Sequence, residues 1–319
     1  MIAYLRRNDG YLVVISPIIV IVGATILAVF SDSLFTQFHD SSAIHTIVDI
    51  ELRSYTKILN GSISVVLSIA TMLYLNRLVS EESLIVKLSN LPLLAFSISF
   101  FLIPLSFQNV TFWSSVLLFV LFISQCLNCL NGRRLANSIF NAAFILGFLT
   151  LFSNGYAIHL VSIVLALVIE GQFNVKRLML LIIGFITPVY FILAILYIFW
   201  PEHLGLISSQ LSMNFSTITW TIPVVSLVFL VFLNITFVQL QAKSLNVREK
   251  KMLRFEILFA FVSLLSIFLL PVGLFAGLTL VPLVVLNARA MTNAKSIWVT
   301  RLLFYSQVIV AAINIVIAM

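Results

Sequence analysis

Long uninterrupted apolar runs are the feature that most limits what this chain can fold into. Seven runs are long enough to cross the roughly 30 Å of hydrocarbon in a bilayer as helices. They cover residues 11–30, 58–76, 91–107, 112–130, 178–200, 219–239 and 302–319. The runs are continuous rather than alternating, so they predict helices and not the strands of a membrane β-barrel. The sequence therefore predicts an all-α integral membrane protein.

Four shorter apolar segments pair into two tight hairpins, 138–152 with 156–170 and 257–271 with 273–288. Together with the seven long runs they predict a polytopic bundle of about 11 transmembrane helices. If one hairpin turns back inside the membrane as a re-entrant loop, the number falls to nine. No Gly/Ser linker or soluble segment interrupts the pattern, so residues 1–319 are expected to form a single transmembrane domain.

Composition agrees with a membrane protein. Hydrophobic residues make up 61% of the chain and charged residues only 9%, whereas a soluble domain carries roughly 25% charged residues. The N-terminal segment has two arginines followed by about 20 apolar residues, longer than the apolar core of a signal peptide. It is therefore predicted to be an uncleaved first membrane helix.

The basic residues predict the orientation of the bundle. In the predicted layout sixteen Lys and Arg residues fall on one side, and only Arg53 and Lys57 fall on the other. The positive-inside rule then places the N-terminus in the cytoplasm and, with an odd number of crossings, the C-terminus outside. The predicted location is the bacterial inner membrane. The most basic stretch, residues 241–256, is predicted to be a cytoplasmic loop that contacts anionic lipid.

The net charge of +7 is explained by this topology, so membrane lipids rather than nucleic acid are the expected partners. Cys126 and Cys129 form a C-x-x-C motif inside an apolar run, without the second pair of ligands that a zinc site needs. The sequence also lacks the phosphate-binding loop, the dinucleotide fingerprint and the metalloprotease motif. We therefore predict no metal site and no cofactor.

The most polar stretch outside the basic connections is "HDSSAIHTIVDIELRSYTK", residues 39–57. Its apolar residues follow the spacing of one helical face, and His45, Asp49 and Arg53 follow each other at intervals of four on the opposite face. This pattern predicts an amphipathic helix at about 41–56, lying on the outer membrane surface. A solvated polar face explains the spacing by itself. Alternatively, His45 and Asp49 act as a general base beside a phosphate held by Arg53.

Within the apolar runs, His159 is the one ionisable residue of the predicted layout. Ionisable groups inside a membrane are functional candidates, although His159 is close enough to a turn to reach the headgroups instead. Neutral polar residues such as Gln125, Asn128 and Asn141 are predicted to form hydrogen bonds between helices. No predicted span carries an acid for a proton relay, which argues against an ion-coupled transporter.

Three segments carry a resemblance to known membrane proteins: "LNRLVSEESLIVKLSNLPLLAFSISFFLIP", "NGRRLANSIFNAAFILGFLTLFSNGY" and "FNVKRLMLLIIGFITPVYF". With them the chain resembles an uncharacterised family of bacterial multi-pass inner-membrane proteins. The order of features, a basic N-terminus, a first helix and an outer loop with an acid-bearing surface helix, resembles the C superfamily of polyprenyl-phosphate-sugar-dependent glycosyltransferases.

The glycosyltransferase resemblance implies a catalytic acid in the first outer loop. Asp40 or Asp49 would be the base, with His45 beside it, and Arg53 and Lys57 would bind the lipid phosphate. The implied function is the handling of polyprenyl-linked sugars in cell-envelope biogenesis, with the lipid-linked glycan as partner. A non-catalytic subunit of an envelope assembly or secretion complex, in contact with other membrane proteins, is the alternative. A lipid or solute transporter is a lesser one, and whether the protein is an enzyme stays open.

Overall fold

The structure is a computed structural model that describes residues 11–30, 57–81, 91–102, 110–132, 134–199, 222–242, 245–270, 272–294 and 296–318. Helix accounts for 91% of these described residues and none of them lies in a strand. The predicted all-α class is therefore confirmed for this part of the chain.

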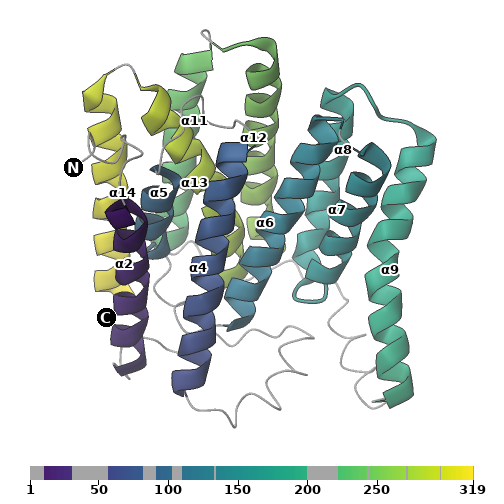
Figure 1. Cartoon of the computed structure of the whole chain (residues 1–319), viewed down its shortest axis with the longest axis horizontal. Coiled ribbons are helices and arrows are strands. Elements are labelled where there is room, and N and C mark those ends of the chain that lie inside the picture. Colours follow the sequence, from purple (N-terminus) through teal and green to yellow (C-terminus); the bar gives the residue numbers. More distant parts are fainter. Residues whose placement is uncertain are drawn as a thin grey trace.

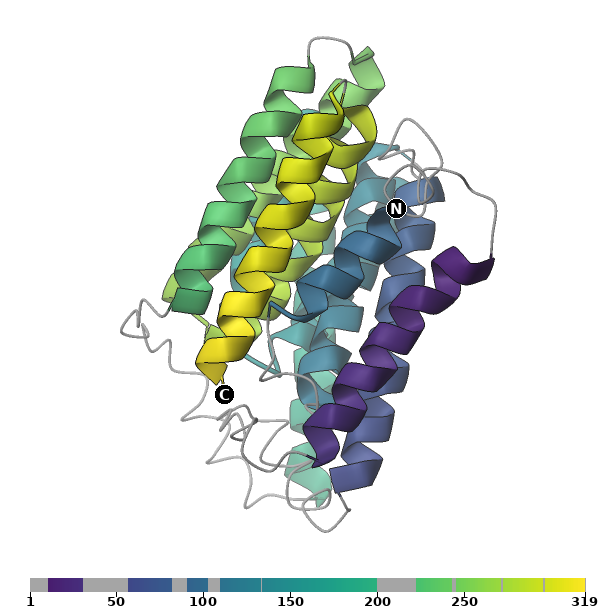
Figure 2. The ribbon, with the colours of Figure 1, turned by 90° about the vertical axis from the view of Figure 1, so that its left-hand side faces the viewer.

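The helices form a bundle of roughly antiparallel rods (Figure 1). In chain order they are α2 (Tyr11–Phe30), α4 (Lys57–Glu81), α5 (Leu91–Phe100), α6 (Val110–Leu130), α7 (Leu135–Leu149), the 3₁₀ helix η2 (Asn154–His159), α8 (Leu160–Ile169), α9 (Val175–Phe199), α11 (Ile222–Gln241), α12 (Val247–Leu265), the 3₁₀ helix η5 (Ser266–Phe268), α13 (Val272–Asn293) and α14 (Ile297–Ala318). The view turned by 90° shows α2 beside α4, and α14 beside α11 (Figure 2).

Five of the described helices are long and apolar enough to cross a membrane: α4, α6, α9, α11 and α13. Shorter apolar helical stretches lie in α2, α5, α7, α8 and α14. Of the two predicted hairpins, the first consists of the short helices α7 and α8, whereas the second includes the 22-residue α13. The number of 11 crossings and the positions of the termini stay predictions.

Many hydroxyl groups inside the apolar helices donate to carbonyl oxygens of their own helix, although those of Ser64, Ser99 and Ser263 have no partner. The Oγ1 atoms of Thr25, Thr71 and Thr279 donate to carbonyl oxygens four residues earlier, at 3.0, 2.7 and 3.1 Å. Such local bonds let a helix carry Ser and Thr without a partner from another helix. The helices therefore stay apolar toward their surroundings although their sequences contain polar residues.

Helix α12 begins ten residues earlier than its apolar segment predicts. Its first residue is Val247, and Asn246 forms a capping box with Glu249. The Asn246 side chain accepts a hydrogen bond from the Glu249 N–H at 2.9 Å, and the Glu249 carboxylate accepts one from the Asn246 N–H at 3.0 Å. The prediction of a loop over 241–256 is therefore wrong for residues 247–256, which are helical. An N-terminal cap can start a helix in a polar stretch that hydropathy does not mark.

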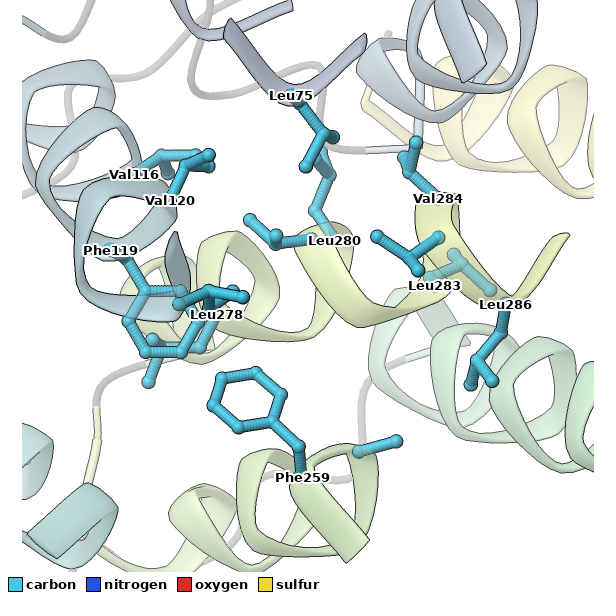
Figure 3. Close-up of a cluster of buried hydrophobic side chains, with 14 of the residues drawn as sticks. Leu75, Val116, Phe119, Val120, Phe259, Leu278, Leu280, Leu283, Val284 and Leu286 are labelled. Atoms are coloured by element: carbon cyan, nitrogen blue, oxygen red, sulfur yellow. The ribbon is translucent and has the colours of Figure 1, made fainter. Parts of the chain in front are cut away.

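Helix α13 is enclosed by neighbouring helices. Every side chain that the structure describes between Phe275 and Met291 is buried, and α13 contacts α5, α6, α11, α12 and α14. In Figure 3, Leu280 and Val284 of α13 lie near Leu75 of α4, and Leu278 lies near Phe119 of α6. The part of the hydrophobic core between α5, α6, α11, α12 and α14 is therefore built around this one helix.

Helix α9 lies at the edge of the bundle and packs chiefly against α7 (Figure 1). A Cβ atom on Gly184 would lie 2.8 Å from the Phe140 carbonyl oxygen, and one on Gly147 would lie 2.7 Å from Cγ of Pro188. The two helices therefore touch backbone to backbone, as small residues allow between membrane helices. The other face of α9 exposes Met179, Ile183 and Phe191, among other apolar side chains.

One end of the bundle collects basic residues, and we call it the basic end. It is formed by the α6–α7, α8–α9 and α11–α12 connections with the helix turns next to them. The Arg248 guanidinium on α12 donates to the Asn131 side chain after α6, and Lys251 pairs with Glu170 after α8, both at 3.1 Å. These contacts place the three connections together, as the predicted layout requires.

We expect Gly147→Ala and Gly184→Ala to lower the free energy of unfolding by about 1–3 kcal/mol each, because an added methyl overpacks the α7–α9 contact. Thermal unfolding in detergent, followed with a dye that reacts with the buried thiols of Cys126 and Cys129, measures the effect. Gly23→Ala is the control, since nothing lies within 4 Å of its added Cβ. Equal midpoints for the three variants would contradict the contact.

Candidate functional site

The residues predicted to act in the first outer loop are outside the part of the chain that the structure describes. This applies to Asp40, His45, Asp49 and Arg53, and to the amphipathic helix at about 41–56. Lys57 is the first residue of α4. Their proposed roles as base and phosphate ligands stay predictions.

His159 is buried at the end of η2, between aromatic rings. Its ring centroid lies 4.8 Å from that of Phe119 and 5.3 Å from that of Phe259, and its Nδ1 lies 3.3 Å from the Ser162 hydroxyl oxygen. The side chain has no exposed surface, so the interpretation that it reaches the headgroups is wrong. Its Nε2 has no hydrogen-bond partner.

A buried ion pair joins α12 to α13. The Arg289 Nη2 donates to Oε1 of Glu256 at 2.6 Å, and the two side chains are 1% and 7% exposed. The sequence predicts both residues outside the spans. The structure places Arg289 within the apolar stretch Phe275–Asn293 of α13, so that prediction is wrong for Arg289, and it buries Glu256 on α12, a helix that is not among the candidate membrane spans. Glu256 is buried because α12 begins early, and Arg289 is buried because α13 continues to Asn293.

Several polar atoms around the centre of the bundle have no hydrogen-bond partner. They are Nε and Nη1 of Arg289, Oε2 of Glu256, and the side-chain amides of Asn287 and Gln307. The predicted interhelical bonds form in part: the Asn314 amide donates to the Leu102 carbonyl oxygen at 3.0 Å, whereas the Asn234 amide donates within its own helix. Neither Glu256 nor Arg289 lines the pocket between α6 and α7 or the pocket beside the start of α12. We therefore interpret the pair as a structural contact that holds α12 against α13.

A pocket of about 540 Å³ lies between α6 and α7 at the basic end. We call it the amide pocket. Every side chain that lines it can form hydrogen bonds: Gln125, Asn128, Arg134, Asn137, Ser138 and Asn141.

The two helices place these side chains by simple spacing. Gln125 and Asn128 are three residues apart on α6, and the α7 residues follow at intervals of three, one and three, which keeps them on one face. The turn between the helices is tight because Gly132 and Arg134 adopt left-handed backbone conformations, with φ of 66° and 42°. The two polar stripes therefore meet directly across the hairpin.

The chemistry of the amide pocket suits binding rather than proton transfer. Side-chain amides both donate and accept hydrogen bonds, and Arg134 adds one positive charge. No carboxylate, histidine or cysteine lines the pocket, so it contains no general acid or base. Among the described residues no group of three or more His, Cys, Asp or Glu side chains could hold a metal ion either.

The sequence contained a signal for this pocket. Gln125, Asn128 and Asn141 are predicted to form hydrogen bonds between helices, but that prediction does not say that they face one shared space. The two polar stripes flank a short turn, and antiparallel helices joined by a short turn pack side by side. Reading both stripes together would have predicted a shared polar site.

Comparison with known protein families, with curated proteins and with solved structures finds no match for this chain. The resemblance to glycosyltransferases therefore depends on the sequence pattern alone.

Breaking the buried ion pair should destabilise the protein strongly. We expect Glu256→Leu and Arg289→Met each to cost about 3–5 kcal/mol, because each leaves the other charge buried without a partner. The double variant should be more stable than either single variant, since no buried charge remains. Denaturation in mixed detergent, followed by tryptophan fluorescence, measures all three.

The partly exposed pair of Lys251 and Glu170 gives the control for this cycle. Glu170→Gln should change stability by only about 0–1 kcal/mol, because solvent screens an exposed pair. If the costs of the two core substitutions simply add in the double variant, the pair does not couple α12 to α13.

Proposed function

We propose that this chain is a multi-pass protein of the bacterial inner membrane that binds the headgroup of a polyprenyl-linked sugar in its amide pocket. The observation that carries the proposal is the lining of this pocket, in which six polar side chains face one space within otherwise apolar helices. The protein would then handle lipid-linked sugars in cell-envelope biogenesis.

The lining of the pocket fits a sugar better than a simple ion. A sugar carries many hydroxyl groups, each of which both donates and accepts, and the five neutral side chains of the pocket offer the same two functions. Arg134 is suited to the phosphate that joins the sugar to its lipid, because guanidinium groups bind phosphate in a bidentate manner. A volume of about 540 Å³ lies within the range of about 300–1,000 Å³ that is typical of small-molecule sites.

The proposed orientation has the basic end in the cytoplasm, the N-terminus inside and the C-terminus outside. The gathering of basic side chains at one end supports it, since cytoplasmic loops carry an excess of Lys and Arg. Gln125 and Asn141 lie about one and a half turns inside the ends of α6 and α7. The amide pocket would therefore open at the depth of the cytoplasmic headgroups.

Sugar transfer is a separate part of the proposal. The amide pocket has no general base, so the transfer that the glycosyltransferase resemblance implies would use Asp40 or Asp49, with His45 beside it and Arg53 and Lys57 on the phosphate. In the chain these residues lie between α2 and the first residue of α4, and the described end of α2 and start of α4 are at the end of the bundle opposite the basic end (Figure 1). The base would therefore act on a sugar lipid bound at its own side of the bundle, and the amide pocket is proposed for binding alone.

Removing amides from the pocket should weaken sugar-lipid binding. We expect Asn128→Leu and Asn141→Leu each to lower the affinity for a polyprenyl-phosphate sugar about three- to tenfold, because one neutral hydrogen bond contributes about 0.5–1.5 kcal/mol. Native mass spectrometry of the detergent-purified protein with a short-chain polyprenyl-phosphate sugar measures the change. Polyprenyl phosphate without sugar should bind the three proteins equally.

Gln172→Leu is the matched control for these variants. It removes an amide from the α8–α9 connection, outside the pocket, and should leave binding unchanged. If Asn128→Leu and Asn141→Leu bind the sugar lipid as tightly as the unchanged protein, the amide pocket is not its site.

The transfer step has its own test. We expect Asp40→Asn or Asp49→Asn to abolish glycan assembly in cells at normal protein abundance, since an amide cannot act as a base. Binding of the sugar lipid to the purified protein should persist. Full complementation of a deletion strain by both variants would exclude a catalytic role for this stretch and leave a binding or scaffold role.

A further inference from the structure

A second pocket at the basic end has a different chemistry. It encloses about 450 Å³ between the end of α6, the end of α8 and the first turns of α12, and we call it the basic pocket. Its lining is Leu130, Asn131, Glu170, Val247, Arg248, Lys251 and Met252. None of these residues lines the amide pocket, so the two pockets are separate sites.

Arg248 is held in position at the wall of the basic pocket. Its Nη2 donates to Oδ1 of Asn131 at 3.1 Å, across 117 residues of chain. A guanidinium has five N–H donors, so the bond to Asn131 leaves donors for a ligand. The bond also restrains the exposed Arg248 side chain, which lowers the entropy cost of ordering it around a ligand.

Lys251 gives the basic pocket a second cation. Its Nζ lies 3.1 Å from Oε2 of Glu170, and an ammonium with three N–H groups has donors left. The two cations and one carboxylate give a net charge of 2 − 1 = +1 in the pocket. Glu170 is thus neutralised by Lys251, and Arg248 has no carboxylate partner among the described residues.

The first turn of α12 offers backbone N–H groups, although the Glu249 carboxylate in its capping box offsets part of the positive potential there. Val247 and Arg248 are the first two residues of this 19-residue helix, and the N-terminus of a helix carries a partial positive charge. Asn246 and Glu249 occupy only one backbone N–H each in the capping box. Anions bind at such helix starts when side-chain cations stand beside them.

The remaining lining is apolar. Leu130 and Met252 are buried against the pocket, and Val247 is exposed at its edge. We infer that the basic pocket binds a phosphate ester, with the phosphate between Arg248 and Lys251 and the organic part against these apolar side chains. This inference is independent of the amide pocket and of the sugar proposed there.

Two sources could supply this phosphate: the headgroup of an anionic lipid, or a soluble phosphate ester. The first arm of the test measures retention of phosphatidylglycerol by native mass spectrometry, against phosphatidylcholine. The second arm measures the thermal shift that glycerol 3-phosphate produces in the detergent-purified protein. A response to phosphatidylglycerol alone identifies a lipid site, and a response to glycerol 3-phosphate identifies a site that also takes soluble esters.

Four variants test the geometry. We expect Arg248→Gln and Lys251→Gln to weaken binding of the responding probe about tenfold or more, as the loss of a charged hydrogen-bond donor predicts. Asn131→Ala should weaken it without any change of charge, because it releases Arg248. Glu170→Gln should strengthen it, because it removes the competing carboxylate and frees Lys251.

Lys250→Gln and Arg254→Gln are the matched controls. Each removes one positive charge from the same helix, but neither residue lines the pocket. Equal losses in the controls and in Arg248→Gln would overturn the inference, because the response would then come from diffuse charge. Binding of neither probe, or a Glu170→Gln variant that binds more weakly, would overturn it too. Failure of the Asn128→Leu test would leave this result untouched.

Discussion

The enclosure of α13 is the constraint on which the rest of the described bundle depends. A helix with neighbours on every side is shielded from water and lipid, so a polar group on it is costly unless the protein supplies a partner. Arg289 is the demanding case: its Nη2 donates to Glu256 on α12, whereas its Nε and Nη1 have no partner. The position of α12 is therefore set by one charge as well as by apolar packing. Helices near the edge, such as α9, have no such requirement and hold to the bundle through close backbone contact at glycine.

The two pockets at the basic end differ in the chemistry of their lining side chains. In the amide pocket nearly all lining groups are neutral and both donate and accept hydrogen bonds, which favours a ligand rich in hydroxyl groups. In the basic pocket the lining groups are two cations, one carboxylate and an apolar wall, which favours an ester of phosphate. Asn128 and Asn131, one helical turn apart on α6 and in the turn after it, belong to different pockets. The end of α6 thus contributes to both sites.

Hydropathy predicted the all-helical class, because a continuous apolar run has few alternatives to a helix. It could not predict where α12 begins, since the first ten residues of that helix are largely polar and only the Asn246–Glu249 cap marks the start. The burial of Glu256 and Arg289 follows from tertiary packing, and a charged residue near a span reads as a loop residue in a hydropathy plot. The spacing of Gln125, Asn128 and Asn141 is visible in the sequence, but it predicts a shared polar site only when α6 and α7 are known to lie side by side. Asp40 and Asp49 are not described, so their site stays a prediction from sequence.

The enclosed position of α13 has a consequence for the order of assembly. Helices of a membrane protein are inserted as they are synthesised, and α13 starts at residue 272 of 319. Four of the five α-helices that α13 contacts, namely α5, α6, α11 and α12, are therefore made before it. Before α13 is made, α5, α6, α11 and α12 lack a helix that contacts all four of them. Glu256 then has no arginine to pair with. The packing of these four helices around a common partner is therefore completed only after all four have been made.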